Sequence, residues 1–176
     1  MSPELQRKHH QYPRLPGAKS VGKEKYRSYV PYYTFKAAAG YFGLDPSDSL
    51  QAEPAGWFPE KNAQPDMFVL QAQGKSMEPL IPDGAYCLFR AGSALAGTRN
   101  GRIVLVRSSG INDPDTESSL TIKRYFSTKE EDHETGWRHR EIRLVPENPD
   151  FETIILTPED EEDFKVIAEF MKILEN

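Results

Sequence analysis

The stretch GKSMEPLIPDGAYCLF, from Gly74 to Phe89, contains the features from which the fold of this chain can be inferred. Its second half joins a Pro-Asp-Gly turn at residues 82–84 to the apolar run AYCLF, which is typical of a β-strand after a tight turn. Its first half places Ser76 between a Gly-Lys pair and Met77. A serine here fits the start of a turn. It also fits a nucleophile, which would need a base elsewhere in the chain.

Outward from this stretch, short β-type runs alternate with turn signals over most of the chain. The turns contain PDG, RNG and NPD, whose residues favour tight turns. Two long polar segments, SSGINDPDTESS and STKEEDHETG, fit exposed hairpin tips. The sequence therefore predicts a mainly β fold, with strands near residues 67–73, 85–90, 102–107, 120–126, 137–145 and 153–156.

The C-terminal segment is compatible with two structures. The residues TPED at 157–160 fit the start of a helix, with a threonine cap and proline at the first position. In FKVIAEFMKIL, residues 164–174, alternate positions are apolar as in a strand, but the same run fits an amphipathic helix. Periodicity alone leaves strand or helix open.

The composition is that of a soluble globular domain with polar loops. The 176 residues are 38% hydrophobic and 28% charged, and no apolar run approaches the roughly 20 residues that span a bilayer. The first residues lack the apolar segment of a secretory signal. The single cysteine, Cys87, lies in an apolar run and is expected to be a buried thiol. We therefore expect a cytoplasmic protein that does not bind membranes.

The charge of the chain is unevenly distributed. The net charge is −5, whereas the first 39 residues carry eight basic and two acidic side chains, a local +6 that leaves −11 for the rest. Residues 1–28 have no apolar period and are expected to form a flexible basic arm. Such an arm could contact nucleic acid or lie against its own domain. Because the whole chain is acidic, direct DNA binding is not expected.

The histidines are poorly placed to act as the base for Ser76. His9 and His10 lie in the arm, His133 in a polar loop and His139 in a charged run, so all four are expected to be solvated. With a single cysteine, they also form no metal-ligand spacing, and no metal or cofactor is expected.

Lys123 occupies a different kind of position. In SLTIKRYF, strand alternation places Leu120 and Ile122 on one face and Thr121, Lys123 and Tyr125 on the other. An ordinary lysine, with a pKa of about 10.4, is almost entirely charged at neutral pH. Burial that lowers the pKa by about three units leaves roughly a third of the amine neutral, enough to take a serine proton. Thr121 could hold the amine in place. An exposed strand lysine is the alternative.

Taken together, these segments resemble the LexA-like serine peptidase family, which includes LexA, UmuD and phage repressors. In that family a Gly-x-Ser-Met segment carries the nucleophile, and an apolar-Pro-Asp-Gly turn follows it, as at residues 74–77 and 81–84 here. The base lies on a Thr-apolar-Lys-Arg strand, here residues 121–124, and the GxIVLV strand between them is matched at residues 101–106. The resemblance implies a LexA/signal-peptidase-like, β-rich peptidase fold. It implies Ser76 as nucleophile and Lys123 as base, with Met77 and Thr121 supporting them.

The resemblance also implies a site of self-cleavage. Family members cut an Ala-Gly or Cys-Gly bond in an extended segment upstream of the serine. VPYYTFKAAAG, residues 30–40, matches this segment and places the candidate bond between Ala39 and Gly40. Small side chains let an extended strand lie flat in a narrow site, and glycine lets the backbone approach the serine closely. A small-residue hinge is the alternative.

On this basis we expect three parts: the flexible basic arm at 1–28, an extended cleavage-site segment and connector at 29–66, and a Ser/Lys peptidase domain at 67–176. In size the chain is closest to UmuD-type proteins without a DNA-binding domain. The resemblance implies a self-cleaving serine endopeptidase in stress or DNA-damage (SOS-like) signalling. Its substrate would be its own N-terminal arm. It would form a homodimer and be triggered by a recombinase filament or a DNA-repair or regulatory protein.

Three other functions are compatible with the sequence. One is a non-cleaving binding module of the same fold that presents its N-terminal arm to a protein or nucleic-acid partner. Another is a signal-peptidase-like enzyme acting in trans. The third is a nucleic-acid binder driven by the arm, whose affinity would fall steeply with salt. The trigger, the client, the active fragment, and cleavage in cis or in trans are left open.

Overall fold

The structure is a computed structural model that describes residues 21–35, 37–39, 53–91, 99–111, 118–134 and 136–175. Residues 1–20 of the expected arm, Gly40, residues 41–52 of the expected connector and residues 112–117 of one expected hairpin tip lie outside the described residues.

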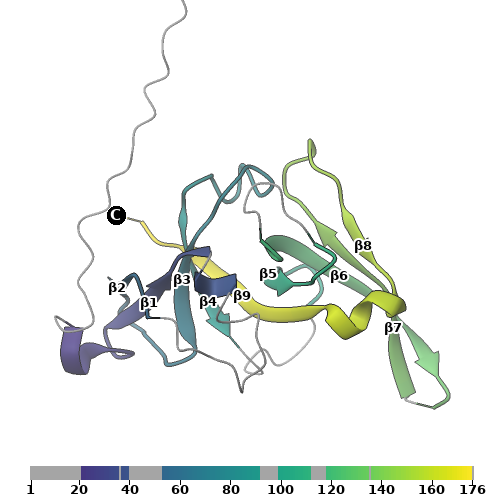
Figure 1. Ribbon diagram of the computed structural model, residues 1–176, viewed down its shortest axis with the longest axis horizontal. Helices are drawn as coiled ribbons and strands as arrows, with labels where there is room; N and C mark the ends of the chain where they lie inside the picture. The colour runs from purple at the N-terminus through teal and green to yellow at the C-terminus, as the bar shows by residue number, and fades with distance from the viewer. Residues whose placement is uncertain are drawn as a thin grey trace, which may run out of the picture.

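The described strands form one mixed sheet (Figure 1). Its order is β2-β1-β3-β4-β9-β5-β6-β7-β8, in which β1 and β3 are parallel and the other neighbouring pairs are antiparallel. This confirms the mainly β fold. The strands are β1 (Tyr29–Tyr33), β2 (Gly56–Pro59), β3 (Met67–Gln71), β4 (Tyr86–Ala91), β5 (Ile103–Arg107), β6 (Leu120–Asp132), β7 (Gly136–Val145), β8 (Ile154–Leu156) and β9 (Lys165–Ile173).

The C-terminal strand β9 joins the two halves of the sheet. It crosses the middle of the molecule in Figure 1 and pairs with β4 on one side and β5 on the other. Before it lies a 3-10 helix, η2 (Pro158–Asp163), where the Thr157 N–H donates to the Asp160 carboxylate at 2.8 Å. The ambiguous segment is therefore a helical turn first and a strand from Lys165 onward.

The central strands are buried on both faces, which explains their nearly continuous apolar runs. In β3, Phe68 and Leu70 belong to one core cluster with Phe89, whereas Met67 and Val69 belong to a second. The β5 strand alternates in the same way between the first cluster and a third, built around β6, β7 and β8. A strand that packs on both sides shows a run of apolar residues instead of alternation.

Two segments differ from the expected arrangement. The segment STKEED, expected in a hairpin tip, continues β6 to Asp132, and its backbone pairs with β7 as far as Asp132 opposite Gly136. Residues 56–59, expected as connector, form the short strand β2 at one end of the sheet. Both segments are held by backbone pairing, which their side-chain pattern does not reveal.

Part of the stretch expected as a flexible arm has regular structure. A 3-10 helix, η1 (Gly22–Glu24), follows Val21, which is buried. Lys25 then lies over the ring of Trp57, with Nζ 5.5 Å from the ring centroid, and Tyr26 packs edge-on against the same ring. Lys25 and Tyr26 are thus packed on Trp57 of β2.

Two observations apply only to the residues that the structure describes. No helix in it is long and apolar enough to cross a membrane. Nor do its histidine, cysteine and acidic side chains form a group of three that could hold a metal ion.

Candidate active site

The segment between β3 and β4 folds back on itself and presents Ser76. Gly74 has a φ of 85°, which a residue with a Cβ rarely adopts, and its N–H donates to Asp83 Oδ1 at 2.9 Å. Further along, the Ile81 N–H donates to the Met77 carbonyl at 2.8 Å. Met77 is buried and Ser76 is half-buried. The Pro-Asp-Gly turn therefore holds the Gly-Lys-Ser-Met segment through Asp83, while Ser76 stays partly accessible to solvent.

Strand β6 brings Lys123 to this serine. Lys123 lies opposite Val104 of β5, and its side chain is buried, with 4% of the residue exposed. Its Nζ lies 3.0 Å from Ser76 Oγ, 2.7 Å from Thr121 Oγ1 and 3.1 Å from the Ile122 carbonyl oxygen. Ser76, Lys123 and Thr121, each singled out in the sequence, are thus brought together.

These contacts define what the pair can do chemically. Lys123 Nζ is buried among the oxygens of Ser76, Thr121 and Ile122. Lys123 Nζ donates to the Ser76 hydroxyl, the Thr121 hydroxyl and the Ile122 carbonyl oxygen, and a lysine amine in its neutral form also has a lone pair that accepts a proton. A hydroxyl within hydrogen-bond reach of such a base is the arrangement that nucleophilic catalysis requires.

A small pocket lies beside Ser76, and part of its wall comes from the segment upstream. Phe35 is 4% exposed and belongs to the same core cluster as Ala38, which is fully buried. The pocket is lined by Phe35, Ala72, Gln73, Gly74, Ser76, Met77, Ile81, Thr121 and Ile122. The chain just before the candidate bond is therefore packed against the Ser76 site.

The conformation of this upstream segment differs from the expected extended one. After β1, Phe35 and residues 37–39 are helical. The Ala38 N–H donates to the Thr34 carbonyl at 2.9 Å, and the Ala37 N–H donates to Thr34 Oγ1 at 3.2 Å. Alanine is the best helix former and Thr34 caps the turn, which gives the local reason. Ala39 is half-buried against the core, while Gly40 lies outside the described residues.

Sequence reasoning missed two residues at this site. Asn148, between β7 and β8, donates its N–H to the Ser76 carbonyl at 3.0 Å and its Nδ2 to the Lys75 carbonyl at 3.0 Å. Its NPD segment was recognisable only as a turn, because nothing local indicates which distant backbone a turn contacts. Phe35 was visible as an apolar residue just before the run of alanines, but the rest of its pocket comes from the segment between β3 and β4 and from β6, which are remote in sequence.

The structure thus combines a mainly β fold with a buried lysine beside a serine on a tight turn. The family model described as Peptidase S24-like matches residues 31–171, which is most of the chain. The chain belongs to this family, and the match confirms the resemblance to LexA-like serine peptidases. None of the curated proteins matches the chain.

Proposed function

We propose that this protein is a self-cleaving serine endopeptidase that cuts its own chain between Ala39 and Gly40. The observation that carries the proposal is the 3.0 Å separation of Lys123 Nζ from Ser76 Oγ, with the lysine buried. Membership of the Peptidase S24-like family supports a serine peptidase. The packing of Phe35 at the pocket beside Ser76, in the same core cluster as Ala38, supports the chain's own upstream segment as the substrate.

The chemistry proceeds in two steps. Neutral Lys123 takes the proton of the Ser76 hydroxyl while Oγ attacks the carbonyl carbon of Ala39. The N–H of Ser76 or of Met77 stabilises the oxyanion that forms. The bond to the Gly40 nitrogen then breaks, and that nitrogen receives the proton from Lys123. Water hydrolyses the resulting ester between Ala39 and Ser76, which leaves the fragments 1–39 and 40–176. Throughout, Thr121 keeps the amine directed at Ser76.

Because the mechanism needs a neutral lysine, the rate of cleavage should rise with pH until the amine is fully deprotonated. The test is intact mass against time for the purified protein at about pH 7 and about pH 10, beside Ser76→Ala and Lys123→Ala. We expect loss of residues 1–39 from the wild type, faster at the higher pH, and no loss from either variant. A wild-type rate that is flat with pH, or cleavage that persists in Ser76→Ala, would contradict the mechanism.

The resemblance to LexA-like serine peptidases extends this proposal to the biological setting. Cleavage would serve stress or DNA-damage signalling, the protein would act as a homodimer, and a recombinase filament or regulatory protein would trigger it. If the isolated protein stays intact, adding a candidate filament to the same mass assay tests for the trigger.

A second candidate function is favoured by the helical turn at the candidate bond. A helical, packed substrate segment fits a binding module that holds its N-terminal segment against its own domain and releases it to a partner without cutting. For such a module, the mass would stay constant at every pH and with any trigger. The segment would still become accessible to an added protease when a partner binds.

A further inference from the structure

The turn between β7 and β8 contacts the backbone on both sides of the proposed nucleophile. The Asn148 N–H donates to the carbonyl of Ser76, and the Asn148 Nδ2 donates to the carbonyl of Lys75, both at 3.0 Å. These two carbonyls belong to consecutive peptide groups. The carbonyl of Lys75 shares its peptide group with the N–H of Ser76. The carbonyl of Ser76 shares the next peptide group with the N–H of Met77.

Holding a carbonyl also orients the N–H of the same peptide group. In a planar trans peptide the C=O and N–H bonds point in opposite directions, so fixing one fixes the other. A carbonyl that accepts a hydrogen bond also polarises its peptide group, which makes the N–H a stronger donor. Asn148, together with the Glu78 N–H that also donates to the Lys75 carbonyl at 3.1 Å, therefore acts on the two N–H groups, of Ser76 and Met77, that are the proposed oxyanion donors.

Asn148 is itself held in place. Its Oδ1 accepts the Asp150 N–H at 3.0 Å, and its carbonyl accepts the Phe151 N–H at 3.2 Å. The bond to Oδ1 assigns the oxygen of the side-chain amide and leaves Nδ2 to face Lys75. The neighbouring Glu147 pairs with Arg124, which follows Lys123 on β6. One turn thus connects the nucleophile segment to the strand that carries the base.

We propose that Asn148 is a positioning residue that aligns the N–H groups of Ser76 and Met77 for oxyanion stabilisation. This inference rests on the proposed peptidase function. It predicts a loss of reaction rate at Ser76 that does not depend on docking of the substrate segment. It also predicts that the pH dependence, set by Lys123, keeps its midpoint when Asn148 is replaced by a neutral residue.

The test uses the full chain and a small fluorophosphonate, which reacts with an activated serine and forms a tetrahedral adduct without peptide binding. The rate of reaction at Ser76 is followed by mass across the pH range, together with the rate of self-cleavage. For Asn148→Ala we expect both plateau rates to fall about 10- to 100-fold, with an unchanged pH midpoint.

Asn148→Asp separates donation from bracing of the turn. Aspartate keeps the acceptor for the Asp150 N–H but has no Nδ2 to donate to Lys75. If the donated bond is what matters, Asn148→Asp stays slow at its own plateau at high pH, where any effect of the new charge on Lys123 no longer enters. If Asn148→Asp recovers the wild-type plateau, Asn148 only braces the turn and the proposal is overturned.

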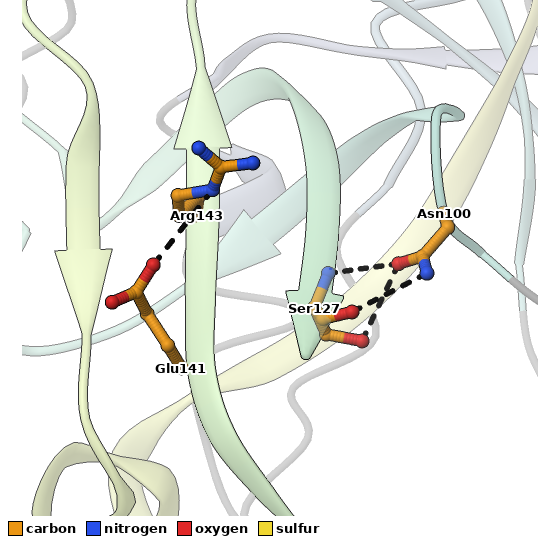
Figure 2. A network of polar contacts seen from close by, with 4 residues as sticks. All are labelled: Asn100, Ser127, Glu141 and Arg143. Carbon is orange, nitrogen blue, oxygen red and sulfur yellow. Dashed lines mark hydrogen bonds and ion pairs between the residues drawn. The ribbon is translucent and has the colours of Figure 1, made fainter. Parts of the chain in front are cut away.

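Asn100→Ala is the matched control. Asn100 also holds a backbone segment, because its Nδ2 donates to the Ser127 carbonyl and its Oδ1 accepts the Ser127 N–H (Figure 2). Ser127 lies four residues along β6 from Lys123, about 13 Å for an extended strand. We expect Asn100→Ala to react at the wild-type rate. Thermal melts of every variant test that each one is folded.

The outcomes separate the two proposals. Active wild type with an equally active Asn148→Ala overturns the role of Asn148 and leaves the peptidase in place. Wild type that neither reacts with the fluorophosphonate nor cleaves itself, with and without a candidate filament, overturns the proposed function, and the role of Asn148 falls with it.

Discussion

Thr121 Oγ1 lies 2.7 Å from Lys123 Nζ, and both residues project from the same face of β6. Thr121 is 1% exposed, so its hydroxyl is removed from water and available to the amine. A lysine side chain has four rotatable bonds, and restricting it to one rotamer costs conformational entropy. The threonine contributes by selecting the rotamer in which Nζ also reaches Ser76.

Replacing Thr121 by valine should slow self-cleavage about ten-fold, because the amine loses an acceptor that directs it at Ser76. Thr121→Ser keeps a hydroxyl and should retain most of the wild-type rate. Thr128→Val changes an exposed residue on the same strand and should have no effect. The rates are measured as the decline of intact mass with time. Wild-type cleavage by Thr121→Val would mean that other contacts hold the amine.

Cys87 should be inert in the folded protein. It is fully buried, and burial raises the pKa of its thiol to about 12. At about pH 8 the thiol is therefore protonated and screened from solvent, whereas the reactive species is the thiolate. An aromatic disulfide reagent should leave the native protein unmodified and should modify it fully in concentrated guanidinium. Cys87→Ala provides the blank, and rapid modification of the native protein would contradict the buried position.

Glu60 should stabilise the fold in a pH-dependent manner. Burial by itself raises the pKa of this carboxyl. The hydrogen bonds from Lys172 and from the Asn62 N–H outweigh burial, and the net pKa is lowered. A carboxyl with a lowered pKa in the folded state stabilises the protein above its unfolded pKa of about 4.3, and loses this contribution as the pH falls through the folded value.

Glu60→Gln should therefore lower the free energy of unfolding by about 1–2 kcal/mol near neutral pH, with the difference shrinking as the pH drops below about 4. Glu141→Gln is the control, because Glu141 and Arg143 form an exposed pair at 3.8 Å (Figure 2). Its effect should be near zero at either pH. Denaturant unfolding at a series of pH values gives both results. A Glu60→Gln deficit that is constant with pH would contradict an ionic origin.

The parts of the fold that could be predicted are those in which side chains dictate the backbone. The runs at Met67–Gln71 and Ile103–Arg107 are apolar because both faces of these strands are buried. Short apolar runs of this kind are typical of buried strands. The polar end of β6 and the short β2 could not be predicted in the same way. The first is held by backbone bonds to β7, and the second contains Gly56 and Pro59, which favour turns elsewhere.

The residues of the candidate site also differ in how far the sequence reveals them. Ser76 and Lys123 could be found because each stands in a local pattern with a chemical meaning, and the fold brings them together. Asn148 could not, because it acts through the backbone carbonyls of Lys75 and Ser76, and a carbonyl is present at every residue. The helical turn after Thr34 shows a further limit, since a run of alanines suits both a narrow cleft and a helix.

That helical turn should slow cleavage, because a helical peptide directs its carbonyls along the helix axis, whereas an extended one can turn a carbonyl toward a neighbouring nucleophile. Thr34→Ala removes the cap on the Ala37 N–H and destabilises the turn by about 1 kcal/mol. If unwinding precedes attack, self-cleavage should become about five-fold faster, since 1.4 kcal/mol corresponds to a factor of ten. Thr34→Ser retains the cap and should cleave at the wild-type rate, and Thr34→Ala combined with Ser76→Ala should stay intact. Slower cleavage by Thr34→Ala would instead show that the cap holds the segment in the orientation from which Ser76 attacks.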